Sequence, residues 1–175
     1  MLILDSLISQ KRIYSVHSGS QIASLRNPVI NRGNLKIEAF EIAAAGIRFL
    51  TVVHSVDIRE WNRLGVIIDS EDDLMEVGHD MPKLKALVED NCQLLEMGVR
   101  TQSGKRLGKV SDFAFDPSDY YIKKIYVDKS SIFSILKDPL IIGRESIIDI
   151  TNKFIIIKDG TIAVRASDVA MEAAT

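Results

Sequence analysis

Two stretches of the chain share the same spacing of hydrophobic positions, although they share few identical residues. Residues 19–42 align without a gap on residues 104–127, a shift of 85 positions, and only Gly19/Gly104 and Ile37/Ile122 are identical. The apolar positions agree much better, in the matched pairs Ile22/Leu107, Leu25/Val110, Leu35/Tyr120, Ile37/Ile122, Phe40/Ile125 and Ile42/Val127. We infer that one structural unit is present twice.

Both stretches break the alternation of a regular β-strand at the same places. A strand points successive side chains to opposite faces, so the apolar positions of one face lie two residues apart. Here positions 22 and 25 are three apart, and so are positions 37 and 40, with the same breaks in the second copy. A β-bulge absorbs one extra residue of this kind. Gly108 suits such a bulge because glycine tolerates unusual backbone angles.

The remainder of each copy has the pattern of short strands separated by turns. Residues 31–34 and 116–119 are rich in turn-forming side chains and precede further apolar runs. Each copy ends in a β-rich run, at residues 66–68 and 155–157. Such closely spaced turns favour small antiparallel barrels over alternating strands and helices. We therefore predict a mainly β chain with two tandem small antiparallel β-barrels joined by a short helix.

The short helix is predicted over residues 80–90, in the sequence "DMPKLKALVED". Asp80 is a candidate N-cap, Pro82 fits a first helical turn, and Asn91 is placed to end the helix. The apolar stripe consists of Leu84, Leu87 and Val88. The predicted organisation is thus a first repeat at 1–79, a linker helix at 80–90 and a second repeat at 91–175. A further short helix is predicted near residues 166–174.

Composition places the chain among cytosolic proteins. One cysteine, Cys92, forms neither an internal disulfide nor half of a CxxC site. The apolar stretch 42–53 is too short for a membrane span and contains Arg48. We therefore expect a cytoplasmic protein without membrane insertion. The acidic charge is concentrated in residues 70–90, with two Lys and seven Asp or Glu, a net of −5, so neither half has the basic excess typical of nucleic-acid binders.

The second copy resembles the PRC-barrel family. The resemblance lies in "GKRLGKVSDFAFDPSDYYIKKIYV", with Gly104, Leu107, Gly108, Val110 and Asp112, and in the later "LIIGRESIIDITNKFIII". The first copy is similar but departs from the pattern: Ala23, Asn27 and Pro28 stand at key positions of its strand. The resemblance implies a small barrel of about six strands per copy. It further implies a non-catalytic module that binds other proteins, and it supplies no catalytic residue.

No motif in the sequence indicates catalysis or metal binding. The segment "GKRLGKVSDF" lacks the spacing of a phosphate-binding loop, which needs four residues before Gly-Lys and a following Ser or Thr. The alternating acids Asp69, Glu71 and Asp73 lack the glycine and final glutamate of a calcium loop. The three histidines, His17, His54 and His79, show no ligand spacing. We expect a buried structural Cys92, no cofactor, no metal and no enzymatic activity.

Two groups of residues are candidates for partner binding. Trp61, with Arg59 and Arg63 beside it, has the composition of an interface hot spot, and packing of Trp61 on its own barrel is the simpler interpretation. The second group comprises Lys105, Arg106 and Lys109, for which a solvated outer face is the simpler interpretation.

The function that we predict is a protein-binding adaptor or scaffold. One alternative is an RNA-processing or ribosome-associated factor that uses the basic strand 105–109. Another is a small-molecule binder or enzyme with its site between the barrels. The barrels are expected to form a pseudo-two-fold pair, with a homodimer of whole chains as the alternative.

Overall fold

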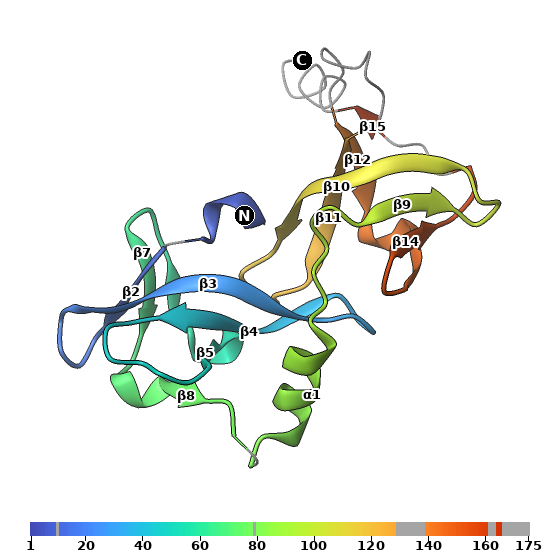
Figure 1. Ribbon diagram of the computed structural model, residues 1–175. Coiled ribbons are helices and arrows are strands. Elements are labelled where there is room, and N and C mark those ends of the chain that lie inside the picture. Colours follow the sequence, from blue (N-terminus) through green and yellow to red (C-terminus); the bar gives the residue numbers. More distant parts are fainter. Residues whose placement is uncertain (10, 79, 129–138, 161–163, 166–175) are drawn as a thin grey trace, which may run out of the picture. The chain divides into compact units, whose positions relative to one another are not determined.

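The computed structural model describes residues 1–9, 11–78, 80–128, 139–160 and 164–165. The predicted helix at 166–174 lies outside these ranges. The chain divides into two compact units, Met1–Cys92 with Asp116–Tyr121 (unit 1) and Gln93–Phe115 with Ile122–Thr175 (unit 2). The fold is mainly β, as predicted, and the described residues form two sheets and one α-helix (Figure 1). That helix lacks the length needed to cross a membrane, and no other helix of the described residues has it.

Unit 1 contains a sheet with the strand order β6-β7-β2-β3-β4-β5-β8. Its strands are β2 (Arg12–Ser15), β3 (Gln21–Asn31), β4 (Lys36–Ala43), β5 (Thr51–His54), β6 (Glu60–Trp61), β7 (Gly65–Ile68) and β8 (Leu74–Glu76). A two-residue strand, β1 (Ile3–Leu4), precedes them, and three short 3-10 turns lie at Asp5–Leu7, Ser55–Asp57 and Glu71–Asp73.

Unit 2 contains a sheet with the strand order β13-β14-β9-β10-β11-β12-β15. Its strands are β9 (Gly98–Thr101), β10 (Arg106–Phe115), β11 (Ile122–Asp128), β12 (Leu140–Gly143), β13 (Ile147–Ile150), β14 (Phe154–Ile157) and β15 (Val164–Arg165). One 3-10 turn lies at Arg144–Ser146, before β13. "GKRLGKVSDF" therefore leads into and forms strand β10, as the sequence analysis predicts, rather than a phosphate-binding loop.

Each sheet departs from purely antiparallel pairing at one place. Strand β7 runs parallel to β2 in unit 1, and β14 runs parallel to β9 in unit 2. After β5 the chain returns across the sheet of unit 1 and places β7 beside β2, in the same direction. After β12 it places β14 beside β9 in the same way. Side-chain periodicity does not encode this choice of partner, so the sequence did not reveal it.

The predicted bulges are confirmed in both units. Strand β3 has an extra residue between Ala23 and Gln21 opposite β2, and β10 has one between Gly108 and Arg106 opposite β9. A second pair of shifts separates Val29 from Ile30 and Ala114 from Phe115, opposite the spacing breaks at 37–40 and 122–125. A third pair lies between Leu25 and Pro28 and between Val110 and Asp112.

Helix α1 (Pro82–Asp90) packs on the sheet of unit 1. Its buried Leu84 joins a cluster with Val29, Ala39 and Val52, so the helix contributes to the core as well as linking two segments of chain. The N-cap is Met81, without a side-chain cap, and the prediction that Asp80 caps the helix is wrong. Pro82 at the start fixes the first backbone angle without that cap. Asn91 closes the helix in the left-handed conformation, as expected.

Apolar side chains, most of them on the strands, fill both cores. In unit 1 the largest fully buried side chains include Ile13, Leu25, Ile37, Phe40 and Ile68. In unit 2 they include Leu94, Phe113, Phe115, Ile122, Ile125 and Ile142. The buried polar residues of the described chain are Ser15, Thr51 and Ser55. Branched aliphatic side chains and phenylalanines thus supply the burial that stabilises each unit.

Candidate partner-binding surfaces

Trp61 packs into unit 1. It lies in the edge strand β6 and is partly buried, and its ring meets Phe40 edge-on with centroids 5.4 Å apart. Its indole N–H donates a hydrogen bond to the Tyr120 hydroxyl at 3.1 Å. Tyr120, in the segment Asp116–Tyr121 of the same unit, is itself 7% exposed. Trp61 thus packs on Phe40 of its own repeat, as the simpler interpretation predicts, and its hydrogen bond reaches Tyr120, outside residues 1–79. A role in partner binding stays a prediction.

Burial changes the chemistry of Tyr120. Desolvation raises the pKa of its hydroxyl, and the hydrogen bond from Trp61 offsets part of that rise. The tyrosine therefore stays neutral at physiological pH and accepts the indole N–H. Its backbone adopts a left-handed conformation, with φ of 59°. Such a conformation in a large side chain requires support from the surrounding packing.

The arginines beside Trp61 differ in their surroundings. Arg59 is exposed and forms an ion pair with Asp69. Arg63 is exposed in the turn between β6 and β7, next to the exposed Leu64. An exposed ion pair contributes little to stability, so Arg59 remains accessible to another acidic group.

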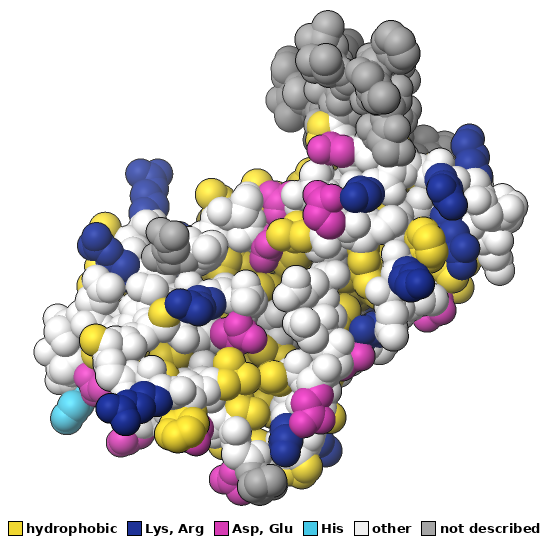
Figure 2. Space-filling model, viewed as in Figure 1, with side chains coloured by type: hydrophobic (Ala, Val, Ile, Leu, Met, Phe, Trp, Pro, Cys, Tyr) yellow, Lys and Arg dark blue, Asp and Glu magenta, His cyan; other side chains and the backbone are white. Residues whose placement is uncertain are grey.

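Exposed basic side chains lie on unit 2 as predicted, at Lys105, Arg106 and Lys109. Lys109 is paired with Glu96 at 3.1 Å. The register places Arg106 opposite Arg100, whose guanidinium lies 4.6 Å from the centre of the Phe154 ring. Figure 2 shows Lys and Arg side chains gathered around β9, β10 and β14. The sequence analysis missed Arg100 and Phe154, which join this face only through strand pairing.

Two of the alternating acids that lack the full calcium-loop pattern, Glu71 and Asp73, accept hydrogen bonds from a serine and from the backbone. The Asp73 carboxylate accepts hydrogen bonds from the amides of Asp69 and Ser70, in a capping box. Glu71 accepts from the Ser18 hydroxyl at 2.7 Å, and this bond is the main cause of its lowered pKa. No group of three or more His, Cys, Asp or Glu within the described ranges is arranged to hold a metal ion.

Cys92 is buried, as expected, and burial raises the pKa of its thiol. A raised pKa disfavours the nucleophilic thiolate. His17 is exposed and His54 is partly buried. The third histidine, His79, lies outside the described residues.

The loop between β4 and β5 is a surface that the sequence analysis did not single out. Within residues 44–50, Ile47, Phe49 and Leu50 are 37%, 67% and 39% exposed. Gly46 turns the loop with φ of 84°, and Arg48 stands between the apolar side chains. We call residues 44–50 the apolar loop. Contiguous exposed apolar side chains are typical of interaction sites.

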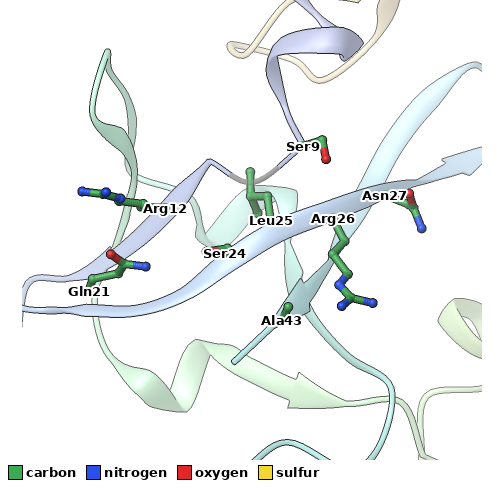
Figure 3. A pocket seen from close by; sticks show the side chains of 8 residues that line it. All are labelled: Ser9, Arg12, Gln21, Ser24, Leu25, Arg26, Asn27 and Ala43. Atoms are coloured by element: carbon green, nitrogen blue, oxygen red, sulfur yellow. The ribbon is translucent and has the colours of Figure 1, made fainter. Parts of the chain in front are cut away.

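A polar groove of about 560 Å³ lies next to this loop on strands β2, β3 and β4. Its polar lining comprises Ser9, Arg12, Gln21, Ser24, Arg26 and Asn27. Ala43, which directly precedes the apolar loop, lines it too. Figure 3 shows Arg12 and Gln21 toward one end of the groove and Arg26 and Asn27 toward the other. We call this depression the Arg12–Arg26 groove. Its two arginines are 14 residues apart, and no motif links them.

Comparison with known families identifies the part of the chain that forms the sheet of unit 2. This sheet contains the bulged hairpin β10–β11 and the returning strand β14. Residues 89–167 match the PRC-barrel domain family. The family resemblance is thereby confirmed for the second half. The match does not extend to residues 1–88. A comparison with curated proteins gives no match to the chain.

Proposed function

We propose that the chain is a non-catalytic protein-interaction module with two PRC-barrel-type repeats, in residues 1–79 and 91–175, joined by a linker helix at 80–90. The assignment of the first repeat is supported by the sheet of unit 1. Each strand from β2 to β8 has a counterpart at the same place in the order of the other sheet. Three register shifts fall at equivalent positions in both sheets, which unrelated barrels do not require.

Details of the backbone and side chains also support the presence of two equivalent repeats. Leu35 and Tyr120, which align at the shift of 85, both have left-handed backbones, with φ of 56° and 59°. Ser18 and Ser103 align in the same way, and each donates a 2.7 Å hydrogen bond to a carboxylate after the returning strand. In each half this bond joins the first hairpin to the end of the parallel strand.

The single observation that carries the protein-binding role is the exposure of the apolar loop. Phe49 is 67% exposed although the core of unit 1 has buried other side chains of its kind, such as Phe40. Covering exposed apolar surface is favourable by about 25 cal/mol per Å², so a partner that covers this loop gains free energy. Phe and Arg are among the residues enriched at interfaces, and Arg48 adjoins Phe49.

The proposal is tested by affinity capture from cells in which the chain is native. Wild type is compared with Phe49→Ser and with the control Val56→Ser, which alters an apolar residue of the same unit that is 75% exposed. We expect specific protein partners that Phe49→Ser loses and Val56→Ser keeps. Partners that both variants keep would contradict a role for the apolar loop.

The same capture separates the proposal from RNA binding. A chain that recovers only RNA, removed by salt and lost on charge reversal at Lys105 and Arg106, would favour the RNA alternative. The overall charge of −2 gives that alternative little support.

A further inference from the structure

The Arg12–Arg26 groove has a lining that suits an anionic ligand. Arg12, Arg26 and the neutral polar residues Ser9, Gln21, Ser24 and Asn27 line it, and none of its described lining residues is acidic. Among the described residues neither arginine forms an ion pair. The nearest acidic residue on the adjoining strand, Glu41, is held by a 2.9 Å hydrogen bond from Asn27.

The charge of the groove is permanent. A hydrogen bond to the Tyr14 side chain raises the pKa of Arg12 above its already high ordinary value. Arginine stays protonated in proteins, and its planar donors match a carboxylate through two parallel hydrogen bonds. Both arginines are exposed, so a ligand reaches them without a change of the backbone.

The strand register sets the spacing of the backbones that carry the two arginines. Arg12 pairs with Ser24 across β2 and β3, and Arg26 follows Ser24 by two residues. Standard strand dimensions therefore place the two Cα atoms on the order of 8 Å apart. Alternate side chains of an extended peptide repeat about every 7 Å. Figure 3 shows the two arginine side chains extending away from each other, so carboxylates at alternate positions of such a peptide match the two guanidinium groups through rotation of these exposed side chains.

One end of the groove adjoins the start of the apolar loop. Ser24 pairs with Ala43, and Ala43 both lines the groove and precedes the loop. A ligand bound at Ala43 therefore lies beside Ala44, the first residue of the apolar loop. Carboxylates and an apolar side chain on one chain are the chemistry of a peptide, whereas a nucleic acid or an inorganic anion lacks the aliphatic group.

We propose that the Arg12–Arg26 groove binds an extended acidic segment of a protein partner, with carboxylates at alternate positions and an apolar side chain against the apolar loop. This inference rests on the proposed protein-binding function and names the chemistry of the partner. Paired charges at the groove fix the register of the segment, and the apolar loop adds buried area.

The test measures the fluorescence anisotropy of a labelled peptide of four Glu-Ser repeats followed by leucine. The comparison peptide replaces glutamate by glutamine. We expect wild type to prefer the glutamate peptide, and Arg12→Gln with Arg26→Gln to weaken binding about tenfold. The matched control, Lys83→Gln with Lys85→Gln on α1, removes the same charge elsewhere on unit 1 and is expected to bind as wild type does.

A gain-of-function variant keeps the test independent of folding losses. Arg12→Glu with Arg26→Glu is expected to bind a lysine–serine peptide that wild type does not bind. Equal weakening by the groove and control variants, or equal affinity for the glutamine peptide, would overturn the inference. Tighter, Arg12-dependent binding of an oligouridine would overturn it in favour of RNA. Loss of the peptide result alone, with Phe49-dependent capture intact, would leave the proposed function standing.

Discussion

Replacing Tyr120 by phenylalanine tests how the segment Asp116–Tyr121 is held in unit 1. The substitution keeps the ring that packs near Phe40, with centroids 6.3 Å apart, and removes the hydroxyl that accepts the Trp61 indole N–H. It therefore removes the Trp61–Tyr120 hydrogen bond, which joins residues far apart in the sequence, and keeps the ring packing. Any loss of stability reports directly on the packing of Trp61.

The expected loss of unfolding free energy is about 1 kcal/mol. A net hydrogen bond contributes about 0.5–1.5 kcal/mol, and the expected value is the middle of that range. Burial raises the pKa of Tyr120. The stability that its neutral hydroxyl contributes is therefore fully present below the unfolded pKa near 10. The contribution is lost as the pH rises through the folded pKa.

The assay is urea denaturation followed by circular dichroism and by the fluorescence of Trp61, the one tryptophan of the chain. A double-mutant cycle of Tyr120→Phe with Trp61→Phe, followed by circular dichroism, gives the coupling, expected at about 1 kcal/mol. Tyr126→Phe, which alters a partly buried tyrosine of strand β11, is the control and is expected to leave stability unchanged. Wild-type stability and emission in Tyr120→Phe would refute the reasoning.

Three further predictions concern the backbone, a carboxylate and the helix. Gly108→Ala is expected to destabilise the chain by about 2–4 kcal/mol in urea denaturation, because a Cβ there lies 1.9 Å from the backbone oxygen of Asp128 at φ of 153°. Hydrogen bonds from Ser103 lower the pKa of Asp159, so its contribution to stability is present above the unfolded pKa and is lost as the pH falls through the folded value. Ser103→Ala is expected to raise that pKa in an NMR titration, and an unchanged value would contradict the assignment. Leu84→Ala is expected to cost about 2–4 kcal/mol in thermal unfolding, against no effect of the exposed Lys83→Ala.

Hydrophobic spacing predicted the strand pairs and their irregularities because both depend on local alternation. The three-residue gap between Ile37 and Phe40 requires an extra residue wherever both side chains are buried, and the structure buries both. Partner choice is different. The parallel pairing of β7 with β2 depends on where the chain returns, and a run such as residues 66–68 has the same pattern in either direction.

The candidate surfaces were only partly predictable. Lys105, Arg106 and Lys109 lie close together in the sequence, and their exposure follows from the strand pattern. The surroundings of Trp61 depend on Tyr120, 59 residues later, so no local signal contained them. The apolar loop was hidden within the longer apolar stretch 42–53, where hydrophobicity alone does not distinguish buried β5 from the exposed Phe49.

The central claim, that the apolar loop is a protein-binding surface, is tested most directly by site-specific photocrosslinking in cells. A photoreactive phenylalanine analogue replaces Phe49 in one variant and Val56 in the other, both exposed on unit 1. The account predicts a discrete protein adduct from position 49 that is absent from position 56 and that diminishes when Arg12 and Arg26 become glutamine. Identical adducts from both positions, or no protein adduct from position 49, would contradict it.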